Sequence, residues 1–206
     1  MTPIRYLRAG IALLVMSMAL GVAAVSGVLK SADTTTFKAL ALTDAKSSDA
    51  LIAVAQFFTQ MGNPGWRAAI VGVMLIVLVY RRCWRAATMF VVTVGLSISG
   101  HSVLKEVLGR SRPTLVPQLD FVDTYSYPSG HAAGAMVILL LGTLLLRNRG
   151  AVWLGVMLSL AIGLSRVALG VHWPSDVIGG WMFGGGAALI GYAMAQPVKR
   201  LKESVN

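Results

Sequence analysis

Long apolar stretches separated by short polar segments dominate the chain. The first stretch, residues 9–29, has no charged residue over 21 positions, which is enough for a helix to cross about 30 Å of hydrocarbon. Since it exceeds the apolar core of a typical signal peptide, we expect this helix to be retained. Five further stretches cover residues 66–80, 86–104, 132–146, 150–165 and 174–198. The pattern predicts an all-α integral membrane protein, a bundle of six transmembrane helices.

The segment between the first two stretches does not fit this pattern. Residues 51–61 are apolar but contain Gln56 and Gln60, and they are too few to cross a bilayer. Together with residues 34–48, we expect them to form a surface-lying or loosely docked helix ahead of the second span. The sequence assigns no function to residues 31–62.

Small residues recur in the last apolar stretch. Gly180, Gly184 and Ala188 follow one another at a spacing of four residues, so they lie on one side of a helix. Small residues at this spacing let two membrane helices approach closely. We therefore expect the last helix to pack tightly against a neighbour. We find neither a long repeat nor an interdomain linker, which indicates a single membrane-embedded domain over residues 1–206.

Composition agrees with a membrane protein. Hydrophobic residues make up 56% of the chain and charged residues 13%, and the mean hydropathy is +0.71. The formal net charge of +10 could suggest a nucleic-acid partner. Here, however, the basic residues form short clusters between apolar runs, a distribution typical of membrane topology. We expect no nucleic-acid partner, and the single cysteine, Cys83, excludes an intrachain disulfide.

The charged residues divide unequally between the two sides of such a bundle. One side receives ten cations and one acid: Arg5, Arg8, Arg81, Arg82, Arg85, Arg147, Arg149, Lys199, Arg200, Lys202 and Glu203. The other side receives eight cations and seven acids: Lys30, Lys38, Lys46, Arg67, Lys105, Arg110, Arg112, Arg166, Asp33, Asp44, Asp49, Glu106, Asp120, Asp123 and Asp176. By the positive-inside rule, both termini should be cytoplasmic.

Three polar segments then lie together on the predicted outer side. They contain Lys105, Arg110 and Arg112; Ser129, Gly130 and His131; and Ser165, Arg166, His172 and Asp176. Arginine and lysine side chains bind phosphate oxygens well. Ser129 and Gly130 come just before a helix, where free backbone N–H groups attract anions. The combination predicts a site for a phosphate group, in which Arg110 contacts either lipid headgroups or substrate.

The two histidines of these segments suggest chemistry at that phosphate. His172 and Asp176 are four residues apart at the start of the last helix, so they share one face. Asp176 could then hold one ring nitrogen while the other attacks phosphorus and forms a phosphohistidine. His131 could protonate the leaving oxygen as a general acid. The cations could neutralise the developing charge, so no metal or other cofactor is required. We interpret His101 as a satisfied polar residue outside the site.

At the level of motifs, the chain resembles the type 2 phosphatidic acid phosphatase superfamily. The matching elements are Lys105-x6-Arg112-Pro113, Pro128-Ser129-Gly130-His131 and Ser165-Arg166-x5-His172-x3-Asp176, which span residues 105–176. The resemblance implies metal-independent hydrolysis of a lipid phosphate. It makes His172 the nucleophile, Asp176 its partner and His131 the acid. The phosphate-binding residues would be Lys105, Arg112, Ser129, Gly130 and Arg166, whereas Ser165 would only pack or cap.

The resemblance further implies a lipid phosphate as substrate and a site at the outer membrane–water boundary. We expect undecaprenyl diphosphate, in a bacterial inner membrane, with phosphatidylglycerol phosphate, phosphatidic acid, diacylglycerol diphosphate and lipid A phosphates as alternatives. Two other classes of function stay open. A lipid phosphotransferase would use the same residues, and an anion transporter would also gather cations at one mouth. Against a transporter, the predicted spans show no paired charges and no matched broken helices at mid-membrane depth. The oligomeric state is not predicted.

Overall fold

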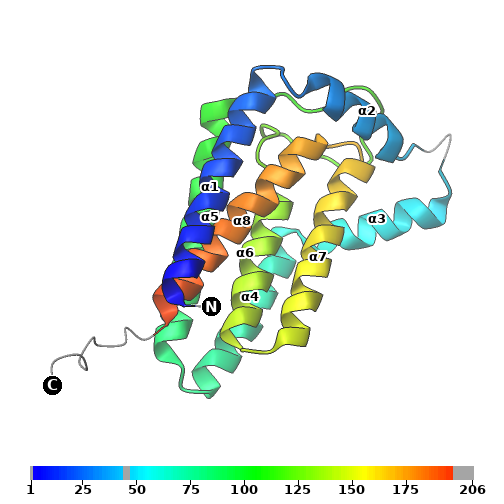
Figure 1. The fold of residues 1–206 in the computed structure, drawn as a ribbon. Coiled ribbons are helices and arrows are strands. Elements are labelled where there is room, and N and C mark those ends of the chain that lie inside the picture. Colours follow the sequence, from blue (N-terminus) through cyan, green and yellow to red (C-terminus); the bar gives the residue numbers. More distant parts are fainter. Residues whose placement is uncertain (1, 44–46, 197–206) are drawn as a thin grey trace, which may run out of the picture.

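The computed structural model describes residues 2–43 and 47–196, and this part of the chain contains helices and no β-strand. The all-α prediction is therefore confirmed for these residues. The helices follow one another as α1 (Pro3–Val25), α2 (Lys30–Leu40), α3 (Asp49–Met61), α4 (Pro64–Tyr80), α5 (Trp84–Leu108), α6 (Gly130–Leu145), α7 (Arg149–Ala168) and α8 (Pro174–Ala195) (Figure 1). Six of them, α1 and α4 to α8, correspond to the six apolar stretches.

The multi-pass membrane character is evident from the lengths and composition of these helices. Within the described residues, α1, α5, α7 and α8 are long and apolar enough to cross a bilayer. The pair α3–α4, bent by 53° at its break, could provide a fifth span. The remaining apolar helix, α6, has 16 residues and lies between α7 and α8. The count of six spans and the cytoplasmic position of the termini stay predictions.

The helix ends are set by local sequence. Proline occupies the first turn of α1, α4 and α8, where its missing N–H costs no hydrogen bond. After α5 the chain turns at Gly109, whose φ of 56° is left-handed and suits glycine. These signals place Lys105 in the last turn of α5 and Asp176 in the first turn of α8, both at the same end of the bundle (Figure 1).

Close packing of α8 against α6 follows from the small residues on α8. A Cβ atom added at Gly180 would lie 2.7 Å from the carbonyl oxygen of Ser129, and one at Gly184 would lie 2.2 Å from that of Ala133. Real side chains cannot approach so closely, so only glycine fits. Ala188 continues this side of the helix and is fully buried. The predicted close approach is confirmed, and it brings the starts of α6 and α8 together.

Filling this contact should destabilise the protein. We expect Gly184→Val to lower the free energy of unfolding by about 3 kcal/mol or more, because the added methyl groups collide with rigid backbone of α6. Thermal unfolding in detergent measures the effect. Gly95→Val on α5 is the matched control, since a Cβ there meets nothing within 4 Å. Equal melting temperatures for the two variants would contradict the packing argument.

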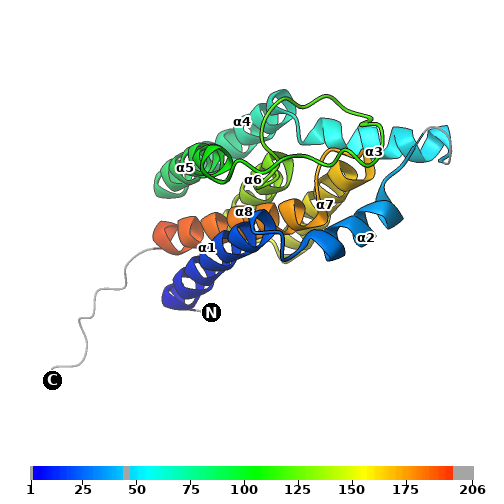
Figure 2. The same ribbon diagram turned by 90° about the horizontal axis from the view of Figure 1, so that it is seen from above.

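The prediction for the segment between the first two spans was wrong in two respects. It forms two helices, α2 and α3, in place of one, with residues 44–46 of the intervening segment outside the described part of the chain. Neither helix is loosely docked, because Phe37 and Asp33 of α2 and Thr59 of α3 are buried. Figures 1 and 2 show α2 lying across the end of the bundle and α3 reaching away beside α7.

Some of the charges sorted above cannot be placed in the structure. Asp44, Lys46, Lys199, Arg200, Lys202 and Glu203 lie outside the described residues. Among the others, the start of α1 and the end of α8 share one end of the bundle, since the ring centroids of Tyr6 and Tyr192 are 5.0 Å apart. The three polar segments of the proposed site lie at the opposite end (Figure 1).

Candidate active site

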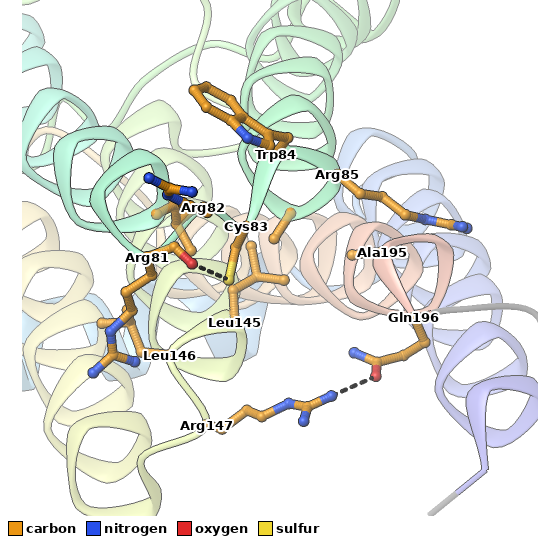
Figure 3. Close-up of a pocket in the computed structure, with 12 residues that line it drawn as sticks. Arg81, Arg82, Cys83, Trp84, Arg85, Leu145, Leu146, Arg147, Ala195 and Gln196 are labelled. Carbon is orange, nitrogen blue, oxygen red and sulfur yellow. Dashed lines mark hydrogen bonds between the residues drawn. The ribbon is translucent and has the colours of Figure 1, made fainter.

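The two ends of the bundle offer different chemistry. At the end near the start of α1, a cavity of about 590 Å³ is lined by four arginines, Arg81, Arg82, Arg85 and Arg147, together with Cys83 and apolar side chains (Figure 3). Its lining contains neither a histidine nor a carboxylate. Among the described residues, its lining therefore offers no histidine or carboxylate to pair with the Cys83 thiol for catalysis. We place the candidate active site at the other end.

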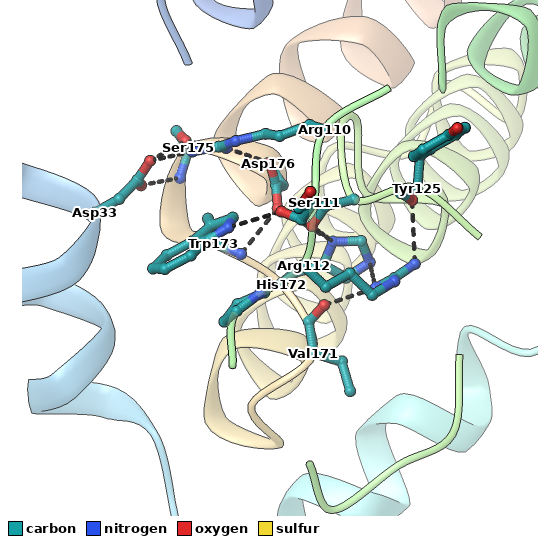
Figure 4. Close-up of polar contacts among 12 residues, drawn as sticks. Asp33, Arg110, Ser111, Arg112, Tyr125, Val171, His172, Trp173, Ser175 and Asp176 are labelled. Atoms are coloured by element: carbon teal, nitrogen blue, oxygen red, sulfur yellow. Dashed lines mark hydrogen bonds and ion pairs between the residues drawn. The ribbon is translucent and has the colours of Figure 1, made fainter. Parts of the chain in front are cut away.

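At that other end, residues from all three polar segments meet. The amide of Ser129 donates a hydrogen bond of 3.0 Å to the carbonyl oxygen of Asp176, which joins the start of α6 to the first turn of α8. A nitrogen of Arg112, from the loop after α5, lies 3.2 Å from Nε2 of His172 (Figure 4). The first, second and third motifs are thus brought into one cluster by the packing of α5, α6 and α8.

His172 is buried and held from both sides of its ring. Nε2 faces Nη1 of Arg112 at 3.2 Å, and Nδ1 lies 3.4 Å from Oδ2 of Asp176 and 3.3 Å from Oγ of Ser126. A guanidinium can only donate hydrogen bonds, so Nε2 must be the acceptor and Nδ1 must carry the proton. Burial, followed by the nearby Arg112 and Lys105 charges, lowers the pKa of His172 well below its ordinary value. Such a neutral ring has its electron pair on Nε2, where it faces Nη1 of Arg112.

Asp176 is fully buried and its two oxygens have separate partners. Oδ2 accepts hydrogen bonds from the hydroxyl of Ser126 and, at 2.8 Å, from the backbone N–H of Trp173. Oδ1 is paired with Arg110. Each oxygen is fixed by donors, so the carboxylate cannot rotate away from His172. This geometry suits the predicted role of Asp176 as partner of the nucleophile.

Arg112 and Lys105 both point into the loop between α5 and α6. Arg112 donates to the carbonyl oxygens of Thr124 at 2.7 Å and Val171 at 2.6 Å. Nζ of Lys105 donates to the carbonyl oxygen of Tyr125 at 2.6 Å. Burial lowers the pKa of Arg112 to about 10, so it still carries its charge at neutral pH. Both cations lie beside His172, as a phosphate-binding role requires.

Arg166 is placed in the site by α7 and is almost completely buried. Its Nη1 pairs with the carboxylate of Asp120, from the loop between α5 and α6, and with the hydroxyl of Thr59 on α3. Its Nε has no hydrogen-bond partner among the described residues. Asp120 is 34% exposed, so a bound phosphate could replace it on Arg166. Ser165 beside it donates to the carbonyl oxygen of Ile162 within α7, in line with a packing role.

His131, in the first turn of α6, is held by the junction between α3 and α4. Its Nε2 lies 2.9 Å from Oδ1 of Asn63. The orientation of Asn63 is fixed because its Nδ2 donates to Oε1 of Gln60 at 2.6 Å. The amide oxygen must therefore accept from Nε2–H of His131. This leaves Nδ1 of the ring to face a substrate.

Ser129 and Gly130 differ from the expectation in one respect. The Ser129 amide is not free for an anion, since it donates to Asp176. Its buried hydroxyl, however, has no partner in the described structure. Gly130 begins α6 and is packed from two directions: its carbonyl oxygen accepts from Arg67 at 3.2 Å, and a Cβ here would lie 3.1 Å from Nε2 of His101. The open donors at this helix start are therefore the Ser129 hydroxyl and the first amides of α6.

Several contributors were not identified from the sequence. They are Asp33, Thr59, Asn63, Arg67, Asp120 and Ser126. Two of them, Asp33 and Thr59, come from the segment to which the sequence assigned no function, and Asn63 and Arg67 follow it at the start of α4. Arg110 was left between headgroup and substrate contact, and in the structure it binds Asp33, Ser175 and Asp176 instead. His101 is buried, with Nδ1 2.9 Å from the carbonyl oxygen of Ser97, as expected for a satisfied polar residue.

No group of three or more histidine, cysteine or acidic side chains that could hold a metal ion occurs in residues 2–43 and 47–196. The metal independence of the reaction stays a prediction for experiment.

Comparison with known proteins gives consistent matches. An undecaprenyl-diphosphatase of Sulfolobus acidocaldarius is 30% identical over 148 residues, which cover 64% of this chain and 66% of that protein. Phosphatidylglycerophosphatase B of Bacillus subtilis is 32% identical over 114 residues, covering 51% and 55%. The matched part thus spans less than two thirds of each of these relatives.

The fold also has a solved counterpart. A transmembrane PAP2-type phosphatidylglycerolphosphate phosphatase from Bacillus subtilis superposes with a TM-score of 0.82 at 23% identity, covering 94% of this chain and 98% of that one. At this identity the likeness concerns the fold alone. The family model of the PAP2 superfamily matches residues 86–200, more than half of the chain. With the three motifs converging on His172 in a fold of this kind, the chain belongs to the PAP2 superfamily.

Proposed function

We propose that this protein hydrolyses a lipid phosphate or diphosphate through a phosphohistidine intermediate. The observation that carries the proposal is the setting of His172, whose Nδ1–H is held by Asp176 and whose Nε2 faces Arg112. A neutral imidazole with one fixed N–H and one electron pair beside cations is an activated nucleophile for an anionic phosphorus centre. The related proteins named above are phosphatases, which supports the same reaction class.

In the first step, Nε2 of His172 attacks phosphorus and the bond from phosphorus to the leaving oxygen breaks. His131 enters this step as an imidazolium, with its Nε2–H on Asn63, and gives its Nδ1 proton to the leaving oxygen. The lipid departs as an alcohol, or as a lipid monophosphate when the substrate is a diphosphate, and His131 is left neutral. Asp176 stabilises the positive charge that the His172 ring gains. In the second step His131 takes a proton from water, the water oxygen attacks phosphorus, and the nitrogen–phosphorus bond breaks. Inorganic phosphate is released.

The cations hold the phosphoryl oxygens during both steps. Arg112 and Lys105 flank His172, and Arg166 approaches from α7. In the structure these three side chains bind the loop between α5 and α6, through the carbonyl oxygens of Thr124 and Tyr125 and the carboxylate of Asp120. Substrate oxygens replace these acceptors when phosphate binds. Fixed positive donors around the developing charge lower the barrier.

The preferred substrate in our proposal is undecaprenyl diphosphate, converted to undecaprenyl phosphate at the outer face of a bacterial inner membrane. A relative named undecaprenyl-diphosphatase supports this choice. Phosphatidylglycerol phosphate and lipid A phosphates are the alternatives, since relatives are named phosphatidylglycerophosphatase and lipid A 4′-phosphatase. The lipid A 4′-phosphatase, from Bacteroides thetaiotaomicron, is 26% identical over 68% of this chain and 74% of that protein. The proposed site residues recognise the phosphate group, so residues outside this site must distinguish one lipid tail from another.

A phosphate-release assay tests the proposal. The purified protein in detergent, with EDTA present, is offered undecaprenyl diphosphate, phosphatidylglycerol phosphate, phosphatidic acid and lipid A. We expect release of inorganic phosphate in EDTA, with the highest kcat/KM on undecaprenyl diphosphate. Transfer of the phosphoryl group to an added acceptor lipid without free phosphate would identify a phosphotransferase. No phosphate release from any of the four, or a complete loss in EDTA restored by Mg²⁺, would overturn the proposed reaction.

A further inference from the structure

A buried carboxylate on α2 lies next to the site without belonging to any motif. Asp33 is 4% exposed. Its oxygens accept from Nη2 of Arg110 at 2.6 Å, from the backbone N–H of Ser175 at 2.9 Å and from the Ser175 hydroxyl at 2.6 Å. The residue stands outside both the motif region and the segment 86–200 that the family model matches.

Arg110 connects this carboxylate to the catalytic one. Its side chain is 9% exposed and forms ion pairs with Asp33 through Nη2 and with Asp176 through Nη1 (Figure 4). Nη1 also donates to the Ser175 hydroxyl at 2.7 Å. The Trp173 ring lies over the guanidinium, 5.8 Å from it. A planar guanidinium fixed at two of its nitrogens and covered by an aromatic ring has little freedom to move.

Arg110 helps to fix which oxygen of Asp176 faces the nucleophile. Arg110 holds Oδ1, while Oδ2, which accepts from Ser126 and Trp173, faces Nδ1–H of His172. The line of contacts therefore runs from α2 to the reacting ring, through Asp33, Arg110, Asp176 and His172. Two carboxylates and one guanidinium leave this group with one negative charge. That charge balances the positive charge that the ring gains when Nε2 bonds to phosphorus.

We propose that Asp33, acting through Arg110, is a positioning residue for the nucleophile. It holds Arg110 on Oδ1 of Asp176 so that Oδ2 stays on His172, and this gives α2 a role in the reaction. The inference rests on the proposed phosphatase function. The alternative is that Asp33 only fastens α2 to the start of α8 through Ser175.

The substitution Asp33→Asn separates these roles. It keeps the shape of the side chain, but its NH2 group can present a donor to Arg110, which is itself a donor. We expect kcat for lipid phosphate hydrolysis to fall by about 10- to 100-fold, as when an outer partner of an active-site ligand is removed, with KM changed less than about threefold because no phosphate contact is lost. Asp49→Asn, at the exposed start of α3, is the matched control and should retain wild-type kcat.

A double substitution tests whether Asp33 works through Asp176. In an Asp176→Asn background, Asp33→Asn should reduce the residual kcat by less than about threefold, since the carboxylate that it positions is already gone. A role confined to fastening α2 would give the same factor in both backgrounds. Equal factors, or a wild-type kcat in the single variant, would overturn the inference even with the phosphatase reaction intact.

A measurement without substrate keeps the inference separate from the proposed function. The chain has three histidines, and their ring ¹⁵N resonances can be recorded on the detergent-solubilised protein. Asp33→Asn should shift the His172 resonances and leave those of His101 unchanged. Unchanged His172 resonances would refute the positioning role whether or not the protein releases phosphate. A wild-type protein inactive on every lipid, with the His172 shift present, would count against the proposed function alone.

Discussion

The substitution His172→Asn should abolish phosphate release, with kcat reduced by on the order of 10⁴-fold or more. Asparagine can still contact Asp176, but it has no nitrogen able to attack phosphorus. The ring is held by Asp176 on one side and Arg112 on the other, and no other described histidine shares both contacts. A hydrolysis that depends on a covalent intermediate therefore has no alternative route in this site. Release of inorganic phosphate from the lipid is the measurement.

The covalent step can be observed directly. Wild-type protein mixed briefly with ³²P-labelled lipid phosphate and quenched in alkali should retain label, since phosphohistidine survives base. His172→Asn should retain none. His101→Asn is the matched control because this histidine is buried and bonded to Ser97 within its own helix, and it should label as the wild type does. Wild-type kcat in His172→Asn, or label that persists in it, would remove His172 as the nucleophile.

The sequence was sufficient to predict the motif residues of the site but not the side chains that hold them in place. Motif residues such as Arg112 and His172 could be grouped because the helix ends and the alternation of apolar stretches predict that their segments lie at one end of the bundle. Their partners could not be found in this way. Arg110 and Asp33 are 77 positions apart and His131 and Asn63 are 68 apart. No local periodicity relates positions so distant, and only the packed fold brings them together.

The error over α2 has a related physical cause. Its sequence has few apolar residues, so it shows no apolar stripe of the kind that predicts a docked helix. The helix is held by a single buried aromatic ring, Phe37, which packs with Trp173 and Val177, and by the buried carboxylate of Asp33. From the sequence alone, an acidic residue on a short polar helix is predicted to be exposed to solvent. Its burial is explained only by Arg110 and Ser175, which lie far along the chain.

The substitution His131→Gln should give the second largest loss, and the loss should depend on the leaving group. Glutamine can still reach Asn63 but cannot donate a proton to a departing oxygen. For a lipid phosphate monoester, whose alkoxide is a poor leaving group, we expect kcat to fall by about 10²- to 10⁴-fold. A diphosphate or an aryl phosphate departs without full protonation, so phosphorylation of His172 should be much less affected. Parallel assays with phosphatidic acid, undecaprenyl diphosphate and p-nitrophenyl phosphate make this comparison.

The same variant should separate the two chemical steps. His131 also has to take the proton from water in the second step, so His131→Gln should phosphorylate itself from p-nitrophenyl phosphate and then stall. We expect a burst of nitrophenolate whose amount equals the molar amount of enzyme, and accumulation of the phosphoryl group on His172. In the substrate complex, where the anionic phosphate favours the imidazolium of His131, the wild-type protein should lose kcat as pH rises and this imidazolium is deprotonated, whereas the variant should lack this basic limb. An equal loss on all three substrates, without a burst, would show that His131 supports the site without transferring protons. The contact between Nε2 and Asn63 would then be structural, and the proton for the leaving oxygen would have to come from solvent.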